Sequence, residues 1–122
     1  MFENETAIHD RLEAILDSIN LILLWSDGRQ TVNDFMLSST GVMAFNACVM
    51  RLQVIGEHVG KLLKDTRKPL ASFPDIPWHA IYGLRNIISH EYANIDEDVI
   101  VSAINEDIPA LKEVIEELLG KY

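Results

Sequence analysis

Apolar side chains recur at steps of three and four residues along nearly the whole 122-residue chain, and no other feature of the sequence constrains the fold more. Such spacing places apolar side chains on one face of a helix. No segment shows the strict alternation of a half-buried strand, and no internal repeat or low-complexity tract interrupts the pattern. We therefore expect an all-α protein, a four-to-five-helix up-down bundle that forms a single domain over residues 1–122.

Caps and turn residues divide this pattern into elements. Gly28 ends the first helix, Thr31 caps a short second one, Pro77 suits the first turn of a later helix, and Asp96 caps the last. Pro109 should kink that last helix. The expected helices are 6–26, 32–37, 40–65, 77–92 and a final helix that follows Asp96.

Each helix carries an apolar face that we expect to be buried. The predicted inward side chains include Val42, Phe45, Val49, Leu52, Ile55, Val59, Leu62 and Leu63, then Ile81, Leu84, Ile87 and Ile88, and in the last helix Val99, Ile100, Ala103, Ile104, Ile108, Leu111, Ile115 and Leu118. Gly56 and Gly60 lie one turn apart in the second long helix, and each costs about 1 kcal/mol relative to Ala. Another backbone approaching that face closely explains both glycines. Cys48, the single cysteine, is expected to be a buried small apolar residue.

The formal net charge of −9 argues against a protein that coats nucleic acid through many phosphate contacts. The charge is uneven, because residues 51–90 carry six cations against three acids. The cluster of Lys61, Lys64, Arg67 and Lys68 is either a solvated face or a guide for RNA. The N-terminus is acidic where a signal peptide needs cations, and the apolar run 19–25 is too short to span a bilayer. We expect a cytoplasmic protein with no membrane partner.

The helix expected at 77–92 concentrates hydrogen-bonding side chains. With Arg85 at 0° on a helical wheel, Ser89 falls at about 40°, Asn86 at about 100° and His90 at about 140°. Tyr92 returns to within about 20° of Arg85. A permanently charged guanidinium and an imidazole that titrates near neutrality suffice to cleave RNA without a metal, because the ribose 2′-hydroxyl supplies the nucleophile.

Less specific interpretations of the same residues stay open. Arg85 could be a surface arginine paired with Glu91 or with another acid, and Glu57 could lie near the site or be a surface carboxylate. His9, His58 and His79 lack the spacing of metal ligands. We expect neither a metal nor any other cofactor, and we interpret Trp25 and Trp78 as packing anchors.

The segment from Arg85 to Tyr92 reads R-x4-H-x-Y, and it resembles the signature of the HEPN superfamily, in particular of the HepT-like ribonucleases. These are toxins paired with an MNT-type minimal nucleotidyltransferase antitoxin. The segment 54–57 resembles the family's I-G-E motif, and 73–78 resembles its P-x-I-P-W lead-in to the motif helix. His58 departs from the pattern, because family members usually have a small residue there.

The resemblance implies a HEPN-like helical homodimer whose active site lies in a cleft between the two motif helices. Arg85 and His90 would be the catalytic pair, with Asn86 and Ser89 in support. Tyr92 matches the tyrosine to which the antitoxin transfers AMP, which would block the site. The expected function is therefore a metal-independent endoribonuclease toxin acting on RNA. The alternative is a non-catalytic helical dimer that binds a nucleotide or a protein in the same cleft.

Overall fold

The computed structural model describes residues 2–122, with side chains from Thr6 onward. Its elements are the helices α1 (Phe2–Trp25), α2 (Val32–Met36), α3 (Ser39–Lys64), α4 (Trp78–Glu91), α5 (Glu97–Ser102) and α6 (Ile108–Leu119), a 3₁₀ turn η1 (Tyr92–Asn94) and a π-helical turn η2 (Ala103–Asp107). All five expected helices are present, and no strand occurs among the described residues.

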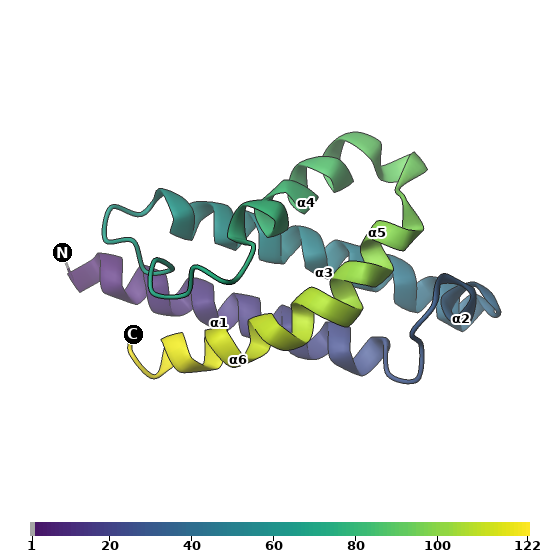
Figure 1. Ribbon diagram of the computed structural model, residues 1–122, viewed down its shortest axis with the longest axis horizontal. Coiled ribbons are helices and arrows are strands. Elements are labelled where there is room, and N and C mark those ends of the chain that lie inside the picture. The colour runs from purple at the N-terminus through teal and green to yellow at the C-terminus, as the bar shows by residue number, and fades with distance from the viewer. Residues whose placement is uncertain (1) are drawn as a thin grey trace.

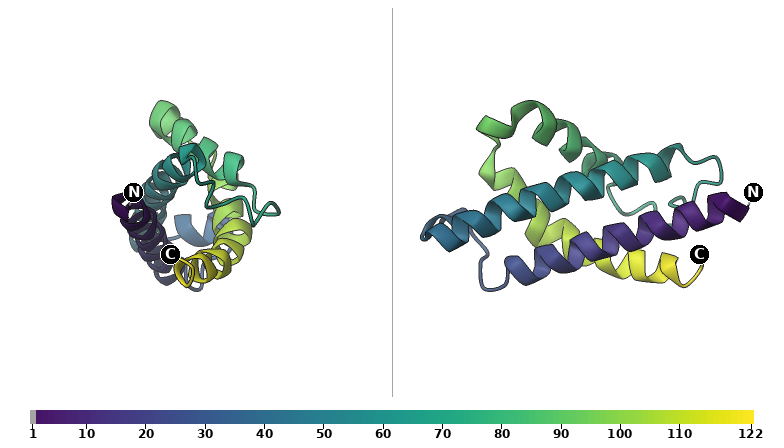
Figure 2. Two further views of the ribbon diagram at one scale, coloured as in Figure 1. Left: turned by 90° about the vertical axis from the view of Figure 1, so that its left-hand side faces the viewer. Right: turned by 180° about the vertical axis from the view of Figure 1, so that it is seen from behind.

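The long helices run up, down, up and down along one axis (Figure 1). Helix α3 packs against α1 on one side and α4 on the other, and α6 packs against α1. Figure 2 shows α4 on the outside of the bundle, with its C-terminal end projecting away from the other helices. The fold is the predicted all-α, HEPN-like bundle, and it leaves the outer face of α4 uncovered.

The helix ends follow the predicted local chemistry. Thr31 and Asp34 form a capping box, in which the Thr31 hydroxyl accepts from the Asp34 amide at 3.1 Å and the Asp34 carboxylate accepts from the Thr31 amide at 3.0 Å. Asp96 caps α5 by accepting from the Asp98 amide at 3.0 Å. Gly28 adopts a φ of 77° in the turn after α1, a conformation that favours glycine.

Three side chains predicted to face the core are instead exposed. Val42 is 36% exposed, Ile87 44% and Val99 42%. Each lies at the margin of an apolar stripe, where the wheel angle alone does not show whether a neighbouring helix is close enough to cover it. The rest of the predicted stripe of α4 is buried, with Ile81, Leu84 and Ile88 packed in the core.

The kink expected at Pro109 takes the form of the π-helical turn η2, immediately before the proline. Proline lacks an amide hydrogen and its ring displaces the carbonyl four residues earlier, so the helix accommodates it by widening one turn. The axis running from α5 through η2 into α6 is therefore one interrupted helix.

The chain between α3 and α4 is irregular but anchored. Trp78 is buried, and its indole N–H donates to the Phe73 carbonyl at 2.9 Å, which ties the loop to the start of α4. This confirms Trp78 as a packing anchor. Within the described residues, no helix has the length and apolar character needed to cross a membrane.

Candidate active site on the outer face of α4

Helix α4 is backed by the core and carries its polar residues outward. Ile81, Leu84 and Ile88 are buried, whereas Asn86 and Ser89 are exposed. His90 is also exposed and Arg85 is half-buried. The structure thus places the predicted polar arc on the uncovered face, where it is accessible to a ligand.

Gly56 lets α4 approach α3 closely, as predicted. A Cβ atom built at Gly56 would lie 2.7 Å from the Cβ of Arg85 and 3.2 Å from the carbonyl oxygen of Ile81, which is part of the α4 backbone. At Gly60 an added Cβ would collide with the ring of Tyr82. Gly56 therefore sets the separation between the helices and brings Arg85 against α3, whereas Gly60 makes room for a side chain and not for the backbone that we expected at both glycines.

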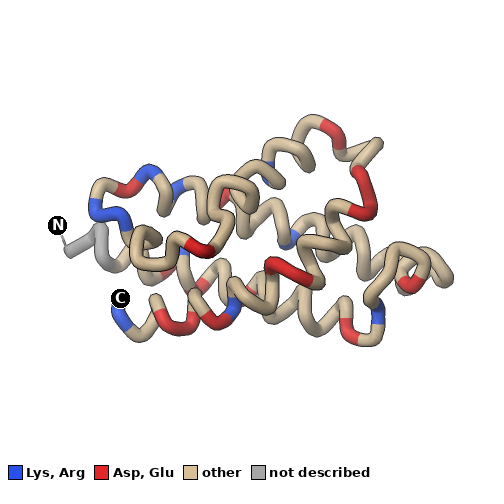
Figure 3. The backbone as a smooth tube through the Cα atoms, viewed as in Figure 1, with Lys and Arg blue, Asp and Glu red and all other residues tan. Residues whose placement is uncertain are grey.

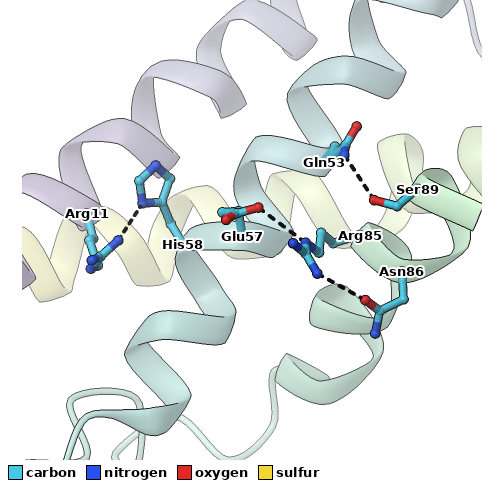
Figure 4. Close-up of polar contacts among 7 residues, drawn as sticks. All are labelled: Arg11, Gln53, Glu57, His58, Arg85, Asn86 and Ser89. Carbon is cyan, nitrogen blue, oxygen red and sulfur yellow. Dashed lines mark hydrogen bonds and ion pairs between the residues drawn. The ribbon is translucent and has the colours of Figure 1, made fainter.

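This close approach joins Arg85 to Glu57. The Nε–H of Arg85 donates to Oε2 of Glu57 at 3.2 Å, and Nη1 donates to Oδ1 of Asn86 at 3.3 Å (Figure 4). Of the two partners considered for Arg85, the structure selects an acid on another helix rather than Glu91. These contacts use Nε and Nη1, whereas Nη2 makes no hydrogen bond to any described residue and remains available to an anion.

A second polar contact joins the same two helices one turn further along. The Nε2 group of Gln53 donates to Oγ of Ser89 at 3.1 Å (Figure 4). The pairs Gln53–Ser89 and Glu57–Arg85 are stacked along an antiparallel helix pair. Sequence reasoning did not single out Gln53. Its place immediately before the segment 54–57, one turn before Glu57, was the signal that could have identified it.

His90 lies on the other side of Asn86. Together the two residues line a hollow of about 430 Å³ between α4 and α5, whose apolar wall includes Ile87, Val99 and Ile100. No described residue hydrogen-bonds to the His90 imidazole. Asn86 thus connects two regions of the face, since it holds Arg85 on one side and borders the His90 hollow on the other.

Tyr92 lies just beyond the end of the regular helix. The α-helix ends at Glu91, whose φ and ψ are −128° and 29°, and Tyr92 begins the 3₁₀ turn η1. The Tyr92 side chain is 61% exposed and borders a separate hollow with Met36, Val42 and other residues of α2, α3 and η1. The wheel angle between Tyr92 and Arg85 assumes an unbroken α-helix, so it stays a prediction across this change of helix type.

The remaining candidates behave as ordinary structural residues. Cys48 is fully buried, and burial raises the pKa of its thiol to about 11, so it is a packing residue as predicted. His58 contacts Arg11 of α1, with 3.3 Å between Nδ1 and the Arg11 Nη1. Among the residues that the structure describes, no three His, Cys, Asp or Glu side chains are grouped to hold a metal ion.

Fold and site together define a class: a helical bundle with an uncovered arginine–histidine face on its fourth helix. The family described as Ribonuclease HepT-like matches residues 11–118, and the chain belongs to this ribonuclease family. This confirms the resemblance carried by the segment 85–92.

Individual relatives agree with the family. A protein named "Putative RNase" from Methanocaldococcus jannaschii is 30% identical over 105 residues, which are 84% of this chain and 87% of that protein. A protein named "Probable ribonuclease HepT" from Thermococcus cleftensis is 29% identical over 109 residues, which are 89% of this chain and 93% of that protein. A "Putative RNase" from Caldanaerobacter subterraneus is 35% identical over 75 residues, 62% of this chain and 64% of that protein. No solved structure matches significantly.

Proposed function

We propose that this protein is a metal-independent endoribonuclease in which Arg85 and His90 are the catalytic residues, supported by Asn86 and Ser89. The observation that carries the proposal is the hydrogen bonding of these two side chains on the uncovered face of α4. The guanidinium is held by Glu57 and Asn86 with Nη2 unoccupied, and the His90 imidazole has no hydrogen-bond partner among the described residues. Arg85 is thus oriented, and neither group is fully engaged by internal contacts.

The proposed reaction needs one base, one acid and one cation. The His90 imidazole accepts the proton of the ribose 2′-hydroxyl, and the 2′-oxygen forms a bond to phosphorus as the bond to the 5′-oxygen breaks. The products are a 2′,3′-cyclic phosphate and a 5′-hydroxyl, which takes its proton from an acid on the opposite side. Arg85 stabilises the charge on the phosphoryl oxygens in the transition state.

A homodimer supplies the missing acid, because one imidazole cannot easily stand on both sides of the phosphorus at once. We propose that two copies meet along the groove between α4 and α5 and share a composite site that contains both His90 side chains. The exposure of Ile87 and Val99, which line this groove beside His90, supports that face. Ala80, Gly83 and Leu84 continue the apolar lining toward η2.

The proposed biological role is the toxin of a type II HEPN/MNT toxin–antitoxin pair. The partner would be an MNT-type nucleotidyltransferase that transfers AMP to Tyr92, whose oxygen would attack the α-phosphorus of ATP and release pyrophosphate. The exposed Tyr92 side chain, two residues from His90, is accessible to such an enzyme. Mass spectrometry of Tyr92 after co-expression tests this step, and the expected result is a mass increase equal to AMP. An unmodified Tyr92 beside an active antitoxin would exclude it.

The main test measures cleavage of single-stranded RNA by the purified, unmodified protein in the presence of a chelator. Arg85→Ala and His90→Ala should each abolish cleavage, because each removes a group that acts in the transition state, while circular dichroism and urea unfolding stay unchanged. RNA with 2′-deoxy residues should resist cleavage. Full activity in either variant would refute the assignment. RNA or nucleotide binding without any cleavage would support the non-catalytic dimer instead.

A mixing experiment tests the composite site. Wild-type protein is unfolded and refolded with an equal amount of His90→Ala protein, so that the subunits assort at random. If both His90 side chains serve one site, about a quarter of the wild-type activity per dimer should remain. A remaining activity of about half would mean that each subunit works alone, and it would contradict the shared site.

A further inference from the structure

A second hollow adjoins Arg85 on the side opposite His90, between the C-terminal half of α3 and the N-terminal half of α4. Its lining consists of Glu57, Gly60, Lys61, Lys64, Tyr82 and Arg85. The space is about 80 Å³, which is enough for two or three water molecules. A site of this size suits a single phosphate-sized group and is too small for a whole nucleotide.

The lining of this hollow is unusually cationic for an acidic protein. Lys61, Lys64 and Arg85 contribute three positive charges against the single carboxylate of Glu57, in a chain with a net charge of −9. Figure 3 shows the cations gathered toward the end of α3, while acidic residues follow α5 and α6. The potential in this hollow therefore favours an anion, although the net charge of the whole chain is negative.

The basic cluster predicted from sequence divides in two in the structure. Only Lys61 and Lys64 line the hollow beside Arg85. Arg67 forms a close ion pair with Asp65, with 2.7 Å between Nη2 and Oδ2, and Lys68 borders a different cavity near Leu70 and Trp78. The cluster is therefore not one surface, and only Lys61 and Lys64 are placed to contact a ligand beside Arg85.

Packing shapes this hollow and orders its side chains. Gly60 lacks a side chain where the Tyr82 ring lies against α3, so the ring forms a wall between the two helices. The Lys64 ammonium lies over that ring, 5.9 Å from its centroid, within the range of a cation–π contact. One lysine is therefore positioned by an aromatic face, and the arginine by Glu57.

We propose that Lys61 and Lys64, on the wall formed by Tyr82, bind a backbone phosphate of single-stranded RNA next to the one that Arg85 and His90 cleave. This inference rests on the proposed ribonuclease function and adds a binding subsite to it. The two regions are continuous, because Arg85 borders the hollow and donates to Asn86, which lines the other hollow together with His90. From Tyr82 to His90 the face extends about 12 Å along the helix axis, at 1.5 Å per residue, so the backbone of the RNA can follow it.

The test compares two double variants that change the net charge equally. One is Lys61→Ala with Lys64→Ala, and the matched control is Lys112→Ala with Lys121→Ala, in the acidic C-terminal part of the chain. Binding of a short, 2′-O-methylated single-stranded RNA, which cannot be cleaved, is titrated at several salt concentrations. We expect the Lys61/Lys64 variant to bind at least about fivefold more weakly, and the slope of log K against log salt to fall by about 0.7 for each lysine. The control should leave the slope unchanged.

Cleavage kinetics separate this subsite from the catalytic assignment. Loss of a contact made equally in the ground and transition states should raise KM and leave kcat near the wild-type value. Normal cleavage together with equal salt slopes in the two double variants would overturn the subsite and leave the ribonuclease proposal intact. A reduced slope for Lys61/Lys64 alone, in a protein that cleaves no RNA, would overturn the ribonuclease proposal and support the subsite. Lys64→Arg should keep the wild-type slope, because it retains the cation.

Discussion

Arg85 donates from Nε to a carboxylate oxygen of Glu57 at 3.2 Å, across a helix pair that Gly56 allows to approach closely. The contact lies on a half-exposed surface, where an ion pair contributes at most about 1 kcal/mol to stability. Its geometric effect is larger than its energetic one. It fixes the direction of a long, flexible side chain and leaves Nη2 without a hydrogen bond to any described residue.

Removing the Glu57 carboxylate should therefore impair catalysis more than stability. We expect Glu57→Ala to lower kcat roughly tenfold, since misorientation of a catalytic group is costly even at small displacements. Binding of RNA should not weaken, because a negative charge has been removed from a phosphate-binding face. Glu57→Gln, which retains an acceptor for Nε, should recover most of kcat. Equal losses in the two variants would show that charge, rather than orientation, is what Glu57 supplies.

Substitution of Gly56 tests whether the backbones of α3 and α4 approach each other closely. Alanine would gain about 1 kcal/mol of helix propensity but would meet Arg85 and the Ile81 carbonyl, and overpacking of this kind costs about 1–3 kcal/mol. We expect Gly56→Ala to lower the free energy of unfolding in urea. Gly83→Ala is the matched control, because a Cβ there meets no atom of its own chain within 4 Å, and in a monomeric Ile87→Glu background it should stabilise α4 by about 0.5–1 kcal/mol. Stabilisation by both substitutions would contradict the close approach.

The proposed dimer face can be tested at its exposed apolar centre. Ile87→Glu places a charge in the groove between α4 and α5, and burying that charge against a second copy would be strongly unfavourable. We expect the protein to become monomeric in sedimentation experiments and to lose cleavage although Arg85 and His90 are intact. Met43→Glu, which changes a 69% exposed residue on α3, should leave the dimer unchanged. A dimeric, active Ile87→Glu protein would place the interface elsewhere.

His58 should make stability depend on pH. Burial, and secondarily the charge of Arg11, lower the pKa of His58 below 6.5, although the charge of Glu57 acts in the opposite direction. The always-charged Arg11 can only donate to Nδ1, which also favours the neutral imidazole. The unfolded chain then binds more protons than the folded one just below pH 6.5, so stability should fall as the pH drops through that window. Thermal unfolding should show a smaller drop between pH 7.5 and 5.5 for His58→Gln than for the wild-type protein. Identical pH dependence in the two proteins would contradict the lowered pKa.

Local signals in the sequence determined much of the fold. Helix positions followed from apolar periodicity, and helix ends from residues such as Thr31, Asp96 and Gly28, whose effects act within one turn. The two glycines of α3 predicted a close approach because nothing local explains their cost in a helix. The arc from Arg85 to His90 was also predictable, since it lies within a single regular helix.

Tertiary structure decided what depends on a second element. A wheel places Ile87 and Val99 on apolar stripes, but only the arrangement of α4 and α5 leaves both exposed in one groove. The regular helix ends at Glu91, and a helical wheel does not show where that end falls or how Tyr92 is placed beyond it. The partner of Arg85 was one of several acids in the sequence, and the antiparallel packing of α3 on α4 selected Glu57. Sequence fixes which groups each helix can present, because helical geometry is local, whereas the pairs they form depend on packing between segments far apart in the chain.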